Sequence, residues 1–224
     1  MATTVEATPM TEPTPTPIAS GSDLPISPAA LKRVGVAVGA VAVLAVAAWV
    51  AVSSGKRKEA FAAEQLSKAR EAADAGNLAL ASSELQKVIT TYSGTSAANE
   101  ATIALNQVRL TNNQSALAID DLRKFVAAKP DAASLAAANG LLGAALENTG
   151  KPGDAATAYA AAAAAAPADF LKAEYQLGQA RALRLSGKTD EAATVYRAII
   201  EKLAATPSVT EAQVRLAELT KGKM

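Results

Sequence analysis

A period of 37 residues runs through most of the sequence and limits the folds open to it. Each repeat carries an alanine, a turn-forming residue five positions before it, and a large residue four positions after it. The alanines are Ala81, Ala118, Ala155 and Ala192, the turn residues Gly76, Asn113, Gly150 and Gly187, and the large residues Leu85, Leu122, Tyr159 and Tyr196. A regular period of this length is typical of stacked helix pairs.

Each of the three positions has a physical role in such a pair. Glycine and asparagine tolerate positive φ at a tight turn, a small alanine lets two helices approach closely, and the large residue fills the space between them. Apolar spacing predicts an all-α solenoid with a ninth, capping helix after Pro207. The predicted pairs are 59–75 with 77–91, 96–112 with 114–129, 131–149 with 152–166, and 168–186 with 188–203.

Composition argues against several kinds of function. The 22 basic and 21 acidic residues nearly balance, which does not suit a nucleic-acid surface. The chain has no cysteine and no histidine, so it lacks the commonest metal ligands, a thiol nucleophile and the usual general base. The acidic pair Asp120 and Asp121 is adjacent in sequence and splays around a helix rather than converging on a substrate. We therefore expect no enzyme, no metal and no cofactor.

The N-terminal part has two segments of different composition. Residues 1–30 are rich in threonine, proline and alanine and are predicted to be a disordered tail. Residues 31–55 contain Val34 to Val52, nineteen residues without a charge, flanked by basic residues. At about 1.5 Å per residue this stretch spans roughly the core of a bilayer, so it predicts a single transmembrane helix. Residues 56–224 then form the repeat domain.

The membrane segment leaves several alternatives open. It is longer than the apolar core of a signal peptide, which favours a retained anchor over a cleaved leader. Gly35 and Gly39 form a GxxxG pair through which two such helices pack, so a homodimer is one hypothesis. The basic residues after the segment outnumber those before it and favour a cytoplasmic repeat domain, but long domains cross membranes largely regardless of charge.

The third repeat resembles the tetratricopeptide family in its pattern of small and large residues. That pattern is carried by Leu142, Gly143, Leu146, Gly150, Ala155, Tyr159 and Pro167. The resemblance covers about residues 60 to 203 and implies a protein-binding solenoid. The second repeat departs from it, because Asn106 and Arg109 stand where the family prefers a small and a large apolar residue.

One membrane helix followed by such repeats is also similar in layout to the bacterial ancillary subunit of the Sec translocon. That resemblance implies a single-pass inner-membrane protein whose repeats lie in the periplasm and assist exported chains in the manner of a chaperone. The alternative is a structural scaffold that organises an envelope assembly or a cell-division complex. Both hypotheses take proteins or peptide segments as partners.

The family's geometry implies that the first helix of each pair lines a peptide-binding groove. The groove candidates are Leu66, Arg70, Ile103, Gln107, Leu110, Glu147, Leu177, Arg181 and Arg184. The family's set of lysine and asparagine residues that clamps a peptide C-terminus is absent. Arg181 and Arg184 are alternatives for holding an acidic peptide group, since a guanidinium pairs well with a carboxylate, unless both are simply solvated.

Overall fold

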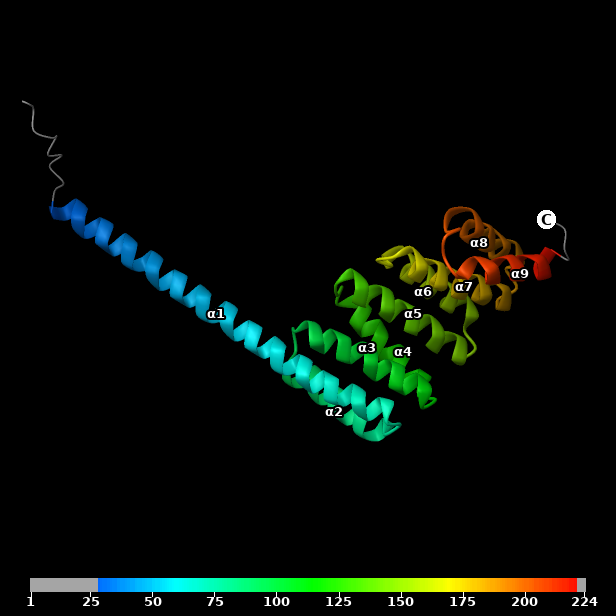
Figure 1. Cartoon of the computed structure of the whole chain (residues 1–224), viewed down its shortest axis with the longest axis horizontal. Helices are drawn as coiled ribbons and strands as arrows, with labels where there is room; N and C mark the ends of the chain where they lie inside the picture. Colours follow the sequence, from blue (N-terminus) through cyan, green and yellow to red (C-terminus); the bar gives the residue numbers. More distant parts are fainter. Residues whose placement is uncertain (1–27, 221–224) are drawn as a thin grey trace, which may run out of the picture. The chain divides into compact units, whose positions relative to one another are not determined.

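The computed structural model describes residues 28–220, apart from the side chains of residues 28–40, 42 and 51, and this part of the chain is all-helical (Figure 1). The chain divides into two compact units between Ala51 and Val52. The helices are α1 (Pro28–Asp74), α2 (Leu78–Thr91), α3 (Ser96–Thr111), α4 (Ser115–Ala127), α5 (Ala132–Asn148), α6 (Pro152–Ala165), α7 (Asp169–Leu185), α8 (Thr189–Lys202) and α9 (Ser208–Thr220).

Helix α1 differs from the expected arrangement of two separate helices. It begins at Pro28, inside the segment predicted to be a tail, and continues to Asp74 at the end of the first repeat helix. Proline suits a first helical position because it has no N–H to leave unpaired there. Nothing between the apolar stretch and the repeats stops the helix, since no proline follows Pro28 before Asp74. The rest of the predicted tail, residues 1–27, lies outside the described residues.

The predicted membrane span falls on α1. Among the residues that the structure describes, no helix combines the length and apolar character that a bilayer crossing requires. Several residues of the predicted span, including the GxxxG pair Gly35 and Gly39, lie among those whose side chains are not described. The large apolar side chains that are described there are 53–70% exposed, and they are Val41, Val43, Leu44, Val46, Trp49, Val50 and Val52.

In the second unit, the turns inside the four helix pairs share one backbone geometry. The residue predicted to sit in each turn has positive φ, at 78° for Gly76, 58° for Asn113, 72° for Gly150 and 82° for Gly187. The next residue donates its backbone N–H to the carbonyl five positions earlier, for example Lys151 to Leu146 at 2.9 Å. This is the Schellman arrangement, which satisfies carbonyls at a helix end. The turn prediction is confirmed.

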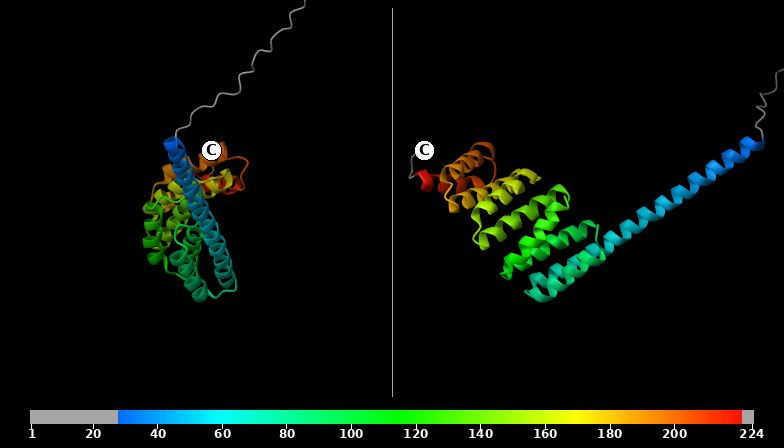
Figure 2. Two further views of the ribbon diagram at one scale, coloured as in Figure 1. Left: turned by 90° about the vertical axis from the view of Figure 1, so that its left-hand side faces the viewer. Right: turned by 180° about the vertical axis from the view of Figure 1, so that it is seen from behind.

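The four periodic alanines lie at the contact between the two helices of a pair. All four are 0% exposed, and the large residues one turn later are 0–6% exposed. Helices pack on their neighbours in chain order from α2 to α9 (Figure 2), and the first helices of successive pairs, α3, α5 and α7, also contact one another. Helix α9 buries Ala212 and Leu216 against this stack, which confirms the predicted capping helix.

Two hydrophobic clusters, rather than one, form the interior of the stack. The first joins the end of α1 with α2 and α3, and the second runs from α4 to α9. Between them lies a polar contact. Asn106 is 0% exposed and donates to the backbone oxygen of Thr102 (2.9 Å), while Arg109 donates to the Asn106 side chain (3.3 Å) and to Asp121. The two residues that depart from the family pattern thus meet at this boundary.

Candidate functional site

Three hollows lie along the first helices of the repeats, and we call them together the groove. They have volumes of about 400, 380 and 330 Å³. Ile103 on α3 lines all three, so they adjoin one another along that helix. Gln107 joins the first hollow to the second, and Arg70 joins the first to the third. The groove therefore follows the helices that the resemblance assigned to ligand binding.

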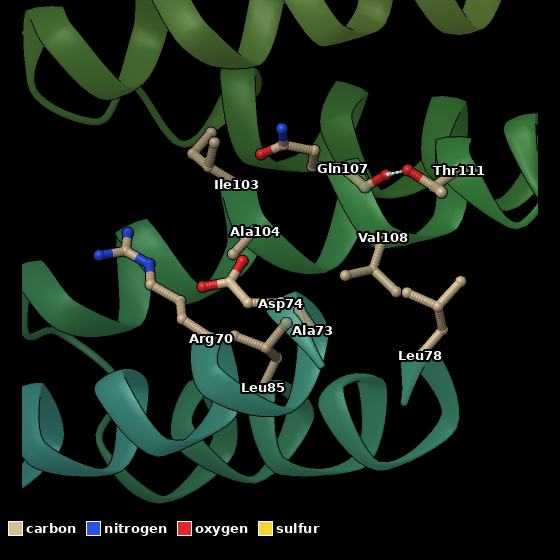
Figure 3. Close-up of a pocket in the computed structure, with 10 residues that line it drawn as sticks. All are labelled: Arg70, Ala73, Asp74, Leu78, Leu85, Ile103, Ala104, Gln107, Val108 and Thr111. Carbon is tan, nitrogen blue, oxygen red and sulfur yellow. Dashed lines mark hydrogen bonds between the residues drawn. The ribbon is translucent and has the colours of Figure 1, made fainter. Parts of the chain in front are cut away.

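The first hollow lies between the end of α1 and α3 (Figure 3). Arg70 and Asp74 extend from α1, and Ile103 and Gln107 come from α3 on the opposite side. The side-chain amide of Gln107 is exposed and forms no hydrogen bond with the part of the chain that the structure describes. An amide has both donors and an acceptor, so Gln107 is able to pair with the backbone of a bound peptide.

The second hollow is floored by small residues of α5. Ala137, Gly140 and Ala144 line it beside one larger residue of the same helix, Leu141, and α7 contributes Glu174 and Tyr175. Gly140 is required by close packing, because a Cβ there would lie 2.5 Å from Cε1 of Tyr175. Small side chains on this floor leave space that leucine or phenylalanine would fill, so the sequence of α5 creates the hollow.

At one end of the second hollow, Arg181 is held by Glu147 in a bidentate ion pair. The Nε and Nη2 atoms of Arg181 donate to the two carboxylate oxygens at 3.1 and 2.9 Å, and the Tyr159 hydroxyl donates to the same carboxylate at 2.9 Å. Burial, followed by the hydrogen bond to Glu147, raises the pKa of Tyr159 above its usual range. The hydrogen bond to Glu147 also raises the pKa of Arg181.

From the sequence, Arg181 was either a site for an acidic peptide group or a solvated side chain, and this ion pair bears on that choice. Its guanidinium already has a carboxylate partner of this chain, with the side chain of Glu147 only 14% exposed. A ligand carboxylate would have to displace that partner and leave Glu147 partly buried without a cation, which is costly. Arg181 is therefore neither a free anion site nor simply solvated.

The other groove cation, Arg70, is also paired. Its Nη2 donates to Glu100 on α3 at 2.9 Å, and both side chains are about half exposed. A pair of this exposure contributes little to stability, on the order of 0–1 kcal/mol. It does place a carboxylate of this chain beside the second guanidinium that lines the groove.

The remaining predicted groove residues are placed differently from one another. Leu66 is only 4% exposed and belongs to the first hydrophobic cluster, so it does not line the groove. Leu110 and Leu177 are partly buried against the second cluster. Arg184 is exposed and unpaired within residues 28–220, but it lines none of the three hollows.

Several residues that line the groove were not expected from the sequence, and three of them are polar or aromatic: Asp74, Asp131 and Tyr175. Asp74 lies one helical turn after Arg70 and faces the first hollow. Asp131 lines the third hollow, where it also caps α5 by accepting the Ser134 N–H at 2.9 Å. Tyr175 forms a wall of the second. Two sequence features could have indicated the first two residues: Asp74 stands four positions after Arg70, and Asp131 directly follows a proline.

The acidic side chains in this part of the chain do not gather into one cluster. Over residues 28–220, no group of three or more aspartate or glutamate side chains converges as metal ligands would. Asp121, one of the acidic pair noted in the sequence, is bound to Arg109. What the groove offers instead is a long surface with an apolar floor and charged edges.

No protein-family model and no curated protein sequence matches the chain. Solved structures do. The crystal structure of putative kinesin light chain TPR-like repeats from Podosopora anserina aligns with a TM-score of 0.58 and 20% identity, covering 71% of this chain and 85% of that one. A second crystal structure, of a form of the same repeats with one amino-acid substitution, aligns with a TM-score of 0.58 and 22% identity, covering 71% and 84%.

The fold is tetratricopeptide-like. Identities at this level establish the architecture of the TPR-like array and not its ligand. The TPR-like fold of the aligned structures agrees with the helix pairs, the turn glycines and the buried alanines described above. The expectation of a TPR solenoid is confirmed, and the resemblance to the Sec-associated family and the membrane anchor gain no support from these comparisons.

Proposed function

We propose that the protein is a membrane-tethered, non-enzymatic interaction module whose groove binds segments of partner proteins. The observation that carries the proposal is the row of three adjoining hollows along α1, α3, α5 and α7. Extended, mixed grooves on the first helices of a solenoid are suited to a peptide chain rather than to a compact metabolite.

The tether is proposed from the apolar residues of α1. Val34 to Val52 contains no charged residue, and its described large side chains are more than half exposed. Exposed valine and leucine along a helix of this length need a covering, and a bilayer core would provide one. Basic residues follow at once, at Lys56, Arg57 and Lys58, where they would meet lipid headgroups.

The finer proposal places this module in the inner membrane of a bacterium, with the repeats in the periplasm, assisting exported chains beside the Sec translocon. It rests on the layout of one apolar helix followed by four repeats. Transient capture of many unfolded segments suits a wide groove with a small-residue floor. A scaffold for a fixed envelope complex would instead hold one stoichiometric partner.

Site-specific photocrosslinking in living cells tests the groove. A photoactivatable residue at Gln107 of the full chain is expected to give crosslinked protein adducts, whereas the same residue at Lys124, exposed on α4, is the matched control. Equal crosslinking at both positions would contradict binding in the groove. Adducts with translocon subunits and nascent exported chains would support export assistance, and a single stoichiometric adduct would support the scaffold.

Thiol labelling tests the membrane and its side, because the natural chain contains no cysteine. In Lys188→Cys the thiol lies at the turn before α8. We expect a membrane-impermeant maleimide to label it in intact cells, and deletion of residues 34–52 to release the chain into the soluble fraction. Labelling only after lysis would place the repeats in the cytoplasm. A chain that stays in the membrane fraction without residues 34–52 would refute the tether.

A further inference from the structure

The groove has more carboxylates than guanidinium groups, and some of the carboxylates have no cationic partner within the described part of the chain. Two guanidinium groups, those of Arg70 and Arg181, and four carboxylates line the three hollows, and a fifth carboxylate is bound to Arg181 beside them. Together these groups carry a surplus of three negative charges. The five carboxylates belong to Asp74, Glu100, Asp131, Glu147 and Glu174.

This surplus is a local property. The whole chain has a formal net charge of +1, so the groove is opposite in sign to the protein that carries it. Clustering of one sign of charge along a cleft with low-dielectric walls strengthens the field there and draws in ligands of the opposite sign.

Both cations are already bound, whereas three of the carboxylates are not. Arg70 is paired with Glu100 and Arg181 with Glu147. Over the described part of the chain, no cation forms an ion pair with Asp74, Asp131 or Glu174. The negative charge that remains available is therefore distributed over all three hollows, with Asp74 in the first, Glu174 in the second and Asp131 in the third.

The floor between these carboxylates suits long aliphatic stems. Ile103 lies where the three hollows meet, and Ala137 and Ala144 continue the apolar surface. Lysine and arginine lay their methylene stems along such surfaces while their charged ends remain at the polar edge. Gln107, exposed between the first two hollows, would meet the peptide backbone.

We propose that the groove selects basic segments of partner proteins, with lysine or arginine ends at Asp74, Asp131 and Glu174 and their stems on Ile103. This rests on the proposed function and names its ligand. An acidic segment is disfavoured for two reasons: over the described residues no cation that lines the groove is free to receive it, and three carboxylates repel it.

The test uses the full chain in a non-ionic detergent and three labelled synthetic peptides of equal length. Alanine alternates with lysine in the first, with glutamine in the second and with glutamate in the third. Fluorescence anisotropy at low salt is expected to show the lysine peptide binding about tenfold more tightly than the glutamine peptide, as several exposed ion pairs would produce. The difference should shrink at about 1 M salt, where charges are screened beyond roughly 3 Å.

Two double variants with the same net charge separate the groove from the rest of the surface. Asp74→Asn with Glu174→Gln removes two free groove carboxylates, both exposed, and should weaken lysine-peptide binding about fivefold. Asp120→Asn with Glu201→Gln removes two exposed carboxylates on α4 and α8 and should change it less than about twofold. Melting followed by circular dichroism checks that both are folded.

Several results would overturn the inference. Tighter binding of the glutamate peptide would do so, as would equal losses in the two double variants. Salt-dependent self-association that Asp74→Asn with Glu174→Gln abolishes would show that a second copy of the chain, and not another protein, occupies the groove. Crosslinks at Gln107 combined with no preference for the lysine peptide would refute the inference and leave the proposed function standing.

Discussion

Gly178→Ala is expected to destabilise the repeat region, although alanine is the better helix former. Gly178 on α7 and Gly143 on α5 enclose the ring of Tyr159 from two sides. A Cβ at Gly178 would lie 2.9 Å from Cε1 and 3.0 Å from Cδ1 of that ring, and one at Gly143 would lie 2.8 Å from both atoms. Carbon atoms in ordinary contact are about 3.5–4.0 Å apart.

The ring has little freedom to move away from an added methyl group. It is 6% exposed, and its hydroxyl is hydrogen-bonded to Glu147 at 2.9 Å. Overpacking of this kind costs about 1–3 kcal/mol, whereas replacing a helical glycine by alanine gains about 1 kcal/mol. The balance predicts a net loss of about 0–2 kcal/mol in the free energy of unfolding, with a midpoint of about 1 kcal/mol.

Urea unfolding of residues 52–224, followed by circular dichroism, measures this loss, and a second background tests its cause. In Tyr159→Leu the large ring is absent, so Gly178→Ala should become neutral or stabilising by up to about 1 kcal/mol. An equal loss of stability from Gly178→Ala in both backgrounds would refute the steric explanation. A gain of stability in the chain that keeps Tyr159 would show that the ring moves freely.

Two further predictions concern pH. The Ser134 backbone N–H lowers the pKa of Asp131, so the helix cap is present at neutral pH and is lost as the pH falls through that lowered value. Asp131→Ala should cost about 1 kcal/mol in urea unfolding at pH 7 and less at acid pH, where the carboxylate is protonated; a cost that does not change with pH would contradict a charged cap. Burial and Glu147 raise the pKa of Tyr159, so stability should decline above about pH 10, where the unfolded phenol ionises. Tyr159→Phe should flatten that decline. An unchanged slope of stability against pH would show that Tyr159 does not cause it.

The helix pairs could be predicted from the sequence because their determinants are local. A residue that tolerates positive φ is needed wherever the Schellman turn closes a helix, and Gly76, Asn113, Gly150 and Gly187 mark those places directly. The predicted helix at 77–91, for example, differs from α2 (Leu78–Thr91) by one residue. Contacts within a repeat join residues that are close in sequence, so the residue types that they require recur in every repeat and can be seen as a periodic pattern.

The groove was harder to predict because its properties depend on neighbouring repeats. Arg181 and Glu147 are 34 residues apart, and only the stacking of α7 on α5 brings them together. Leu66 was expected on the open face, but the rotation of α1 against α2 turns it into the core. Which side chains remain free for a ligand follows from such pairings between helices, and a single sequence does not record them.

The polar contact of Asn106, Arg109 and Asp121 has a consequence for how the array opens. In a solenoid, each repeat is stabilised only by its neighbours, so unfolding proceeds most easily where the interface between neighbours is weakest. Here the fully buried apolar residues divide into two clusters between α3 and α4, and only partly buried side chains of α3, Ile103 and Leu110, pack against the second cluster. Amide protons of α2 and α3 should therefore exchange with solvent through a partial opening that leaves α5 to α8 protected. We therefore expect the array to unfold as two cooperative units of unequal size, with hollows of the groove on both sides of the boundary between them.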